Sequence, residues 1–137
     1  MNTYNFDDSI FKESQLYQEF IRENPSLGFL RIRAYAASQA LPISGLRVII
    51  SKVLDNNKII FFDGVTNDSG VIERINLPTP RINDDNQVIP KNITYDIEAI
   101  YTPDNINRKY SVNMYENVYA VQNISVVPNI NNGVGGF

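Results

Sequence analysis

Hydrophobic and polar residues alternate one by one through residues 29–51, FLRIRAYAASQALPISGLRVIIS. The alternation occurs in two parts, which a link containing proline and glycine separates. Its apolar members are Leu30, Ile32, Ala34, Leu46, Val48 and Ile50. A period of two is typical of strands that turn one face to a core and the other to solvent or a partner. This stretch therefore predicts two β-strands joined by a crossover.

The rest of the chain contains five more short segments with strand-like patterns, separated by turn residues. They lie near residues 58–63, 71–77, 95–101, 110–114 and 122–128. The first of them, KIIFFD, contains four consecutive apolar residues and so predicts a strand that is covered on both faces. Seven short strands at regular spacing predict an all-β fold, a seven-stranded antiparallel β-sandwich.

A helical pattern precedes the strands, from about residue 9 to residue 23, and Asn24-Pro25 ends it. Its apolar face consists of Ile10, Tyr17, Phe20 and Ile21. Two interpretations are open: this amphipathic helix packs on its own sandwich, or it docks on a neighbouring subunit. The chain then has three parts, which are an N-terminal arm with the helix (1–28), the β-sandwich (29–128) and a glycine-rich C-terminal tail (129–137).

Length and charge limit the partners that the chain can have. At 137 residues and a net charge of -3, it is expected to be one domain without a basic field for nucleic acid. No apolar run is long enough for membrane insertion, and the N-terminus lacks the layout of a signal peptide. We therefore expect a location on a spore surface, a particle or the cell envelope after lysis or dedicated export, and otherwise in the cytoplasm.

Histidine and cysteine are both absent. This excludes disulfides, thiol nucleophiles, Ser-His-acid triads and zinc sites built on these residues. Carboxylates remain for acid–base chemistry, namely Asp84, Asp85, Glu98 and Glu116, but their spacing does not favour a catalytic pair. The oxygen-rich turns at 67–69 and 83–86 lack the spacing of a known calcium loop. The sequence thus predicts a protein that is not an enzyme and has no cofactor, no metal and no catalytic residue.

Short turn motifs give the chain a family resemblance. LPISG at 41–45 precedes the second strand, VTNDSG at 65–70 precedes the fourth, and YDIEA at 95–99 follows. This order resembles the carboxypeptidase-regulatory-like, or transthyretin-like, family of prealbumin-type β-sandwiches over about residues 23–130. More narrowly, ENP at 23–25 and LPTP at 77–80 resemble a module of Gram-positive spore formers that occurs beside cell-wall-binding and cortex-lytic units. The resemblance implies a transthyretin-like sandwich that serves as a spacer, docking domain or assembly unit without catalysis.

The two ends of the chain extend beyond the predicted sandwich and indicate self-association. An N-terminal arm could add a strand to an open sheet edge of another copy. Head-to-tail contacts of this kind do not close and would give a homo-oligomer or a filament. We expect a structural protein that assembles into a filament or surface layer, with a spore or cell-wall component as a further partner. The predicted contact residues are Tyr4, Phe6, Tyr17, Phe20, Ile21, Val134 and Phe137.

A second hypothesis is a monomeric domain that binds a glycan or peptidoglycan. Exposed tyrosines on a sheet face can stack on sugars, and the candidates are Tyr35, Tyr101 and the loop at 79–92. The same tyrosines would also stabilise the outer face of a sheet as cross-strand pairs. Both interpretations of these residues stay open at this point.

Overall fold

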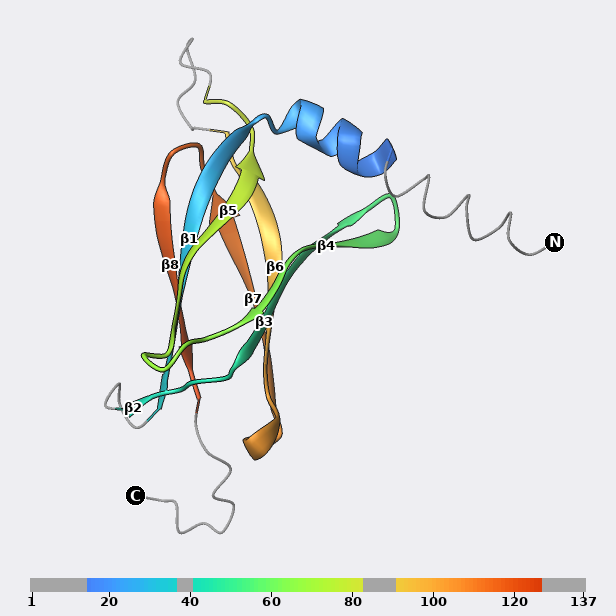
Figure 1. Ribbon diagram of the computed structural model, residues 1–137. Coiled ribbons are helices and arrows are strands. Elements are labelled where there is room, and N and C mark those ends of the chain that lie inside the picture. Colours follow the sequence, from blue (N-terminus) through green and yellow to red (C-terminus); the bar gives the residue numbers. More distant parts are fainter. Residues whose placement is uncertain (1–14, 37–40, 83–90, 127–137) are drawn as a thin grey trace, which may run out of the picture.

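The computed structural model describes residues 15–36, 41–82 and 91–126, and their strands form two facing sheets (Figure 1). Sheet A contains β5 (Val71–Thr79), β1 (Ser26–Ala36) and β8 (Tyr119–Ser125), with the short strand β2 (Leu41–Pro42) on the end of β1. Sheet B contains, in order, β4 (Asn57–Val65), β3 (Arg47–Leu54), β6 (Ile93–Tyr101) and β7 (Ile106–Met114). A 3-10 helix, η1 (Thr102–Asp104), joins β6 to β7.

The strand directions correct one part of the prediction. β1 pairs with β5 in the antiparallel sense but with β8 in the parallel sense, so the sandwich is not antiparallel throughout. The predicted count of seven is not confirmed either, because the two-residue strand β2 adds a short pairing at Tyr35 and Ala36. The predicted crossover is present, since the link after β1 passes from sheet A to β3 of sheet B.

The core lies between the two sheets and is made by the predicted apolar positions. Six of these positions, in β1, in β3 and directly before β3, are at most 2% exposed, and they are Leu30, Ile32, Ala34, Leu46, Val48 and Ile50. Tyr95 and Ile97 of β6 and Ile124 of β8 complete this layer. Burying one such aliphatic side chain stabilises the fold by roughly 1.5–3 kcal/mol. The period of two therefore identified the core faces of these strands.

The segment predicted to be covered on both faces is β4, and that prediction is wrong. β4 is an edge strand of sheet B, and Ile60 is 54% exposed. Phe62 lies opposite Ile50 and Ile60 lies opposite Ser51, which leaves Phe61 as the extra residue of a β-bulge. Because of this bulge, Phe61 and Phe62 are adjacent in sequence yet both pack against the core. The apolar run thus reflects a bulged edge strand.

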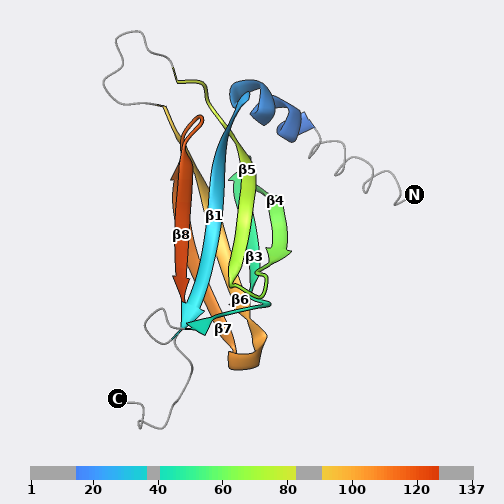
Figure 2. The ribbon, with the colours of Figure 1, turned by 60° about the vertical axis from the view of Figure 1, so that its left-hand side comes forward.

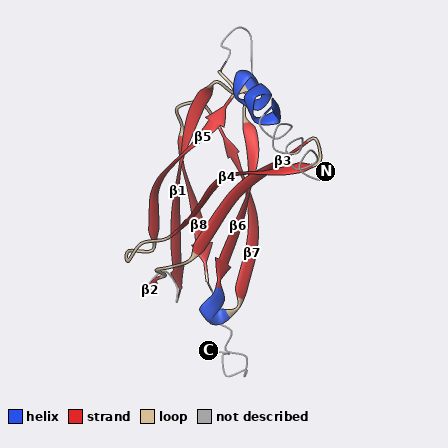
Figure 3. Cartoon of the chain, turned by 45° about the vertical axis from the view of Figure 1, so that its right-hand side comes forward, coloured by secondary structure: helices blue, strands red, loops and turns tan. Residues whose placement is uncertain are grey.

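The N-terminal helix, described over residues 15–23, lies across the end of the sandwich where β1 begins and β5 ends (Figure 3). Phe20 is 6% exposed, and its ring centroid lies 5.2 Å from that of Phe61 and 6.3 Å from that of Tyr95. The buried Asn24 ends the helix, because its backbone N–H and its side-chain amide both donate to the Phe20 carbonyl at 2.9 Å. The helix therefore packs on its own sandwich, and Ile10 lies outside the described residues.

Candidate functional site

The outer edge of β8 is the margin of sheet A (Figure 2). Phe29 N–H donates to the Val118 carbonyl at 3.0 Å, and Val126 N–H donates to the Tyr35 carbonyl at 2.8 Å. The even-numbered residues of β8 therefore direct their backbone groups at β1. The odd-numbered ones direct theirs away from it, and these are Tyr119, Val121, Asn123 and Ser125. Within the described ranges no strand pairs with this side of β8.

β8 also lacks the features that usually prevent pairing at a sheet edge. Its sequence, YAVQNIS, contains neither a charged residue nor proline. The other marginal strands do contain them: β4 has Lys58 and Asp63, β5 has Glu73, Arg74 and Pro78, and β7 has Arg108 and Lys109. Charges and proline on an edge strand oppose the addition of another strand. One group on β8 is occupied, because the Gln122 side-chain amide donates to the Asn123 carbonyl at 3.0 Å.

The outer face of sheet A presents apolar side chains directly beside this edge. Tyr119 is 68% exposed and Val121 is 55% exposed. The Tyr119 ring stacks on Phe29 of β1 with 4.6 Å between the ring centroids. The Arg74 guanidinium carbon lies 4.3 Å from the Phe29 ring centroid, within cation–π distance. The result is an aromatic pair of the exposed Tyr119 and the half-buried Phe29, with a cation over the Phe29 ring.

Arginines continue along the same face toward the other end of β1. Arg31 is loosely paired with Glu73 at 3.9 Å, and both side chains are exposed. Arg33 lies 5.7 Å from the centroid of the Tyr35 ring. Among β1, β5 and β8, Glu73 is the single acidic residue beside three arginines, although the whole chain has a net charge of -3. This face is therefore locally positive, and such a field favours acidic partners.

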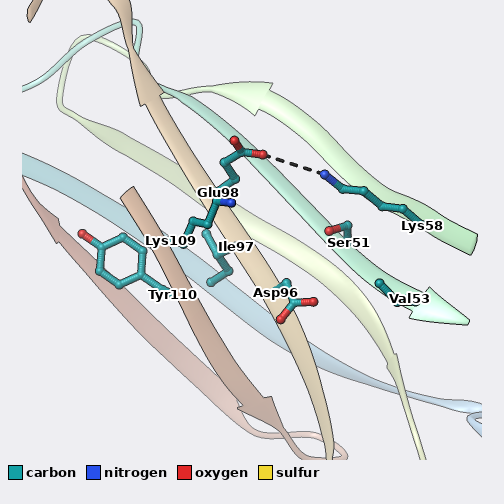
Figure 4. Close-up of a pocket in the computed structure, with 8 residues that line it drawn as sticks. All are labelled: Ser51, Val53, Lys58, Asp96, Ile97, Glu98, Lys109 and Tyr110. Atoms are coloured by element: carbon teal, nitrogen blue, oxygen red, sulfur yellow. Dashed lines mark ion pairs between the residues drawn. The ribbon is translucent and has the colours of Figure 1, made fainter. Parts of the chain in front are cut away.

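A second feature is a hollow of about 270 Å³ on the outer face of sheet B (Figure 4). Its charged lining consists of Lys58, Asp96, Glu98 and Lys109. Lys58 Nζ lies 3.9 Å from a Glu98 carboxylate oxygen. The two lysines balance the two acids, and exposed pairs at this distance contribute little. This hollow therefore has no net charge with which to select a ligand.

The described residues provide neither a cluster of metal-binding side chains nor a helix that could cross a membrane. Those residues include no group of three or more acidic side chains placed to hold a metal ion. The 67–69 turn uses its oxygens internally, because Asn67 Oδ1 accepts from the backbone N–H groups of Ser69 and Val71 at 2.9 and 3.0 Å. No helix in the described part of the chain is long and apolar enough to cross a membrane.

The structure places the predicted contact residues in different environments. Phe20 is a core residue of its own chain, so we remove it from the predicted interface. Tyr17 is 39% exposed, and Ile21 is half-buried against the core. The remaining four lie outside the described residues, and they are Tyr4, Phe6, Val134 and Phe137.

The predicted glycan contacts are not brought together. Tyr35 lies on the outer face of sheet A. Tyr101 ends β6 in sheet B, where it follows the inward positions of Tyr95, Ile97 and Ala99 and packs against the core. Residues 83–90 of the predicted binding loop lie outside the described residues. The two tyrosines therefore form no common platform.

The candidate carboxylates do not form a pair either. Asp84 and Asp85 lie outside the described residues. Glu98 lines the hollow on sheet B, whereas Glu116 lies in the turn between β7 and β8. Glu116 accepts hydrogen bonds from the Ile82 N–H and the Ser26 hydroxyl, both at 2.7 Å. These two donors lower the pKa of Glu116, which suits a structural acceptor in a turn.

The sequence alone does not reveal that Phe29, Tyr119 and Arg74 belong to one surface. The two aromatic residues are far apart in sequence and meet only because β8 returns beside β1. The signal that was present is the absence of charge and proline over residues 119–125. Such an absence, in a strand at a sheet margin, marks an edge that is open to pairing.

Comparisons with known proteins find distant structural similarity. No family model matches the chain, and no curated protein matches it. Solved structures similar to it include Klebsiella pneumoniae 5-hydroxyisourate hydrolase, with a TM-score of 0.46 and 14% identity over 74% of this chain and 85% of that one. Transthyretin from Sparus aurata has a TM-score of 0.44 and 14% identity over 71% and 90%. (S)-allantoin synthase has a TM-score of 0.46 and 13% identity over 77% and 42%.

These comparisons correct the prediction that the chain is not an enzyme. That prediction took a non-catalytic role from the family resemblance, yet the similar structures include a hydrolase and a synthase. At 13–14% identity and TM-scores of 0.44–0.46, the likeness transfers neither reaction to this chain. The comparisons do not support the narrower link to carboxypeptidase-regulatory and spore modules. The observed topology by itself describes two facing sheets that form a β-sandwich.

Proposed function

We propose that the chain is a structural building block that self-associates by β-strand addition. In this proposal, the open edge of β8 in one copy accepts a terminal extension of the next copy. The observation that supports it most directly is the set of outward backbone groups on an uncharged, proline-free edge strand. Such an edge is a template for another strand, and main-chain hydrogen bonds supply part of the affinity.

The positions of the described helix and of β8 favour contacts that continue from copy to copy. The described helix extends from the start of β1 toward the side of the sandwich where β4 lies, and β8 lies on the opposite side (Figures 1 and 2). A contact between two different surfaces of the same chain is heterologous, and it gives a filament when the rotation does not close. We therefore propose a filament or surface layer as the assembled form.

Backbone hydrogen bonds and side-chain burial contribute differently to the affinity of this contact. About seven new backbone hydrogen bonds, at roughly 0.5–1.5 kcal/mol each, contribute about 4–10 kcal/mol. Fixing about seven residues of the incoming segment costs roughly 1–2 kcal/mol each, or about 7–14 kcal/mol. The backbone alone therefore does not hold the segment, so its affinity also depends on covering Tyr119 and Val121, at roughly 1.5–3 kcal/mol for each fully buried side chain.

We also propose that this unit belongs with the carboxypeptidase-regulatory-like modules and acts at a spore, particle or cell envelope. The support is that the two turn motifs behind that resemblance meet in space. Ala34 N–H donates to the Gly70 carbonyl at 2.7 Å, and Ile43 N–H donates to the Ala34 carbonyl at 3.0 Å. The link at 42–45 and the turn at 67–70 are thus fixed to the same end of β1.

Proline at position 121 tests the proposed function. The Val121 N–H points away from β1, so Val121→Pro removes an outward donor without breaking the β1 ladder. Val121→Lys places a charge on the edge and leaves the backbone unchanged. Val121→Ile, which keeps the N–H and the apolar side chain, is the matched control. Light scattering after size exclusion and negative-stain electron microscopy measure assembly, and circular dichroism checks the fold.

We expect wild type and Val121→Ile to assemble, and we expect Val121→Pro and Val121→Lys to remain monomeric with wild-type circular dichroism. A wild-type protein that stays monomeric at high concentration would contradict the proposal. So would folded Val121→Pro and Val121→Lys variants that both assemble as the wild type does, because the β8 edge would then be unused.

A further inference from the structure

The N-terminal segment at residues 4–8 of a neighbouring copy is, we infer, the strand that pairs with β8. It runs parallel to β8, and its Asp8 carboxylate pairs with Arg33 of the accepting copy. This inference rests on the proposed function and adds to it the donor segment, its direction and its register.

Along β8, the side chains of the accepting surface change from aromatic and apolar to polar. The outward side chains are aromatic at Tyr119, apolar at Val121 and polar at Asn123. The adjacent β1 positions, in the same order, are Phe29, Arg31 and Arg33. An incoming strand therefore meets an aromatic and apolar surface at the start of β8 and a cation beside its later part.

One end of the chain has the matching pattern. Tyr4, Phe6 and Asp8 are two residues apart, so in a strand they lie on one face as aromatic, aromatic and acidic side chains. The C-terminal tail, NINNGVGGF, has no acidic residue, and its glycines disfavour a strand. Charge complementarity therefore selects the N-terminal arm as the donor.

The direction of the added strand follows from the position that the Asp8 carboxylate takes relative to the arginines. In a parallel arrangement Tyr4 lies beside Tyr119, Phe6 beside Val121, and Asp8 beside Asn123, next to Arg33. An antiparallel arrangement would put Asp8 beside the aromatic pair. The cation there is Arg74, which already lies over the Phe29 ring and donates to the Asn76 side chain at 3.1 Å. The parallel direction thus pairs the acid with the arginine that lies next to it.

The distance across the sheet allows this pair. Neighbouring strands lie about 4.8 Å apart, so an added strand would lie about 10 Å from β1. A long arginine side chain together with a carboxylate can span this gap when the side chain between them is short. Asn123, which would lie between Arg33 and Asp8, is such a side chain. Arg33 forms no ion pair with any described residue.

Disulfide trapping tests the register directly, because the chain contains no cysteine of its own. Asp8→Cys combined with Asn123→Cys is expected to give a ladder of covalent oligomers on a non-reducing gel. Asp7→Cys with Asn123→Cys places the first thiol on the opposite face of the added strand. Tyr4→Cys with Asn123→Cys matches the antiparallel direction. Both control pairs are expected to cross-link at least tenfold more slowly at equal protein concentration.

The outcomes separate this inference from the proposed function. A ladder from the Tyr4 pair, or an internal disulfide within a monomer, would overturn the register or the exchange between copies. If none of the pairs cross-links while the wild type still assembles and Val121→Pro does not, the donor is another segment and the inference fails alone. A monomeric wild type would overturn both.

A charge exchange supplies a second measurement that needs no cysteine. Arg33→Asp is expected to raise the concentration at half assembly roughly two- to fivefold, the range typical of an exposed ion pair. Asp8→Arg combined with Arg33→Asp is expected to restore the wild-type value, because the pair is present again with reversed signs. An effect of Arg33→Asp that the second change does not restore would contradict the pairing.

Discussion

Phe20 is the residue at which the two interpretations of the helix make opposite predictions. If it belongs to the core of its own chain, Phe20→Ala lowers stability; if it were a contact to a neighbour, the change would weaken assembly alone. The ring is 6% exposed and packs on Phe61 and Tyr95. Truncation of a buried phenylalanine to alanine costs about 3–5 kcal/mol. At roughly 3–4 °C per kcal/mol for a chain of this size, the midpoint of thermal unfolding should fall by about 9–20 °C.

Thermal and urea unfolding of purified protein measure this change. Tyr17→Ala is the matched control, because Tyr17 lies on the same helix and contacts the same Phe61 ring at 5.9 Å but is 39% exposed. Its expected cost is about 1 kcal/mol, the worth of one exposed aromatic contact. A Phe20→Ala protein with wild-type stability and impaired assembly would refute the placement of Phe20 in the core.

Two further predictions concern turns. Gly70→Ala should lower the free energy of unfolding in urea more than Gly45→Ala does, by roughly 1–3 kcal/mol. Both glycines have positive φ, but a Cβ on Gly70 would lie 2.5 Å from the Ala34 carbonyl oxygen, whereas one on Gly45 meets no atom within 4 Å. Equal costs would argue against that close approach. Hydrogen bonds from the Ile82 backbone N–H and, to a smaller extent, from the Ser26 hydroxyl lower the pKa of Glu116. A lowered folded-state pKa stabilises the protein above the unfolded value near 4.3, and the effect is lost as pH falls through the folded pKa. The stability difference between wild type and Glu116→Gln should therefore be full at pH 7 and shrink below about pH 4, and a difference that does not change with pH would contradict this.

The sequence predicted the core faces well because burial leaves a local, periodic signal. Leu30, Ile32 and Ile50 alternate with polar neighbours and are all buried. The same kind of signal predicted the helix from Phe20 and Ile21. It could not say which surface the helix covers, because an apolar stripe has the same pattern whether it packs on its own chain or on another.

Pairing between distant strands leaves no such local signal. The parallel contact of β1 with β8 joins Phe29 to Tyr119, and nothing near either residue specifies the other. The bulge in β4 had a similar effect, because one extra residue at Phe61 makes an edge strand look like a strand buried on both faces. The aromatic and arginine surface was missed for the same reason, since it exists only after these distant strands have paired.

The charge distribution connects the open edge with the proposed partner. Copies of a chain with a net charge of -3 repel one another at long range, and this opposes indiscriminate association. Arg31, Arg33 and Arg74 reverse the sign of the charge on one face, next to the edge strand that lacks protection. An acidic segment is therefore attracted to the place where backbone groups are free, and a neutral or basic segment is not. A positive face beside an open edge thus gives the edge specificity for one kind of strand, whereas an open edge alone would favour aggregation.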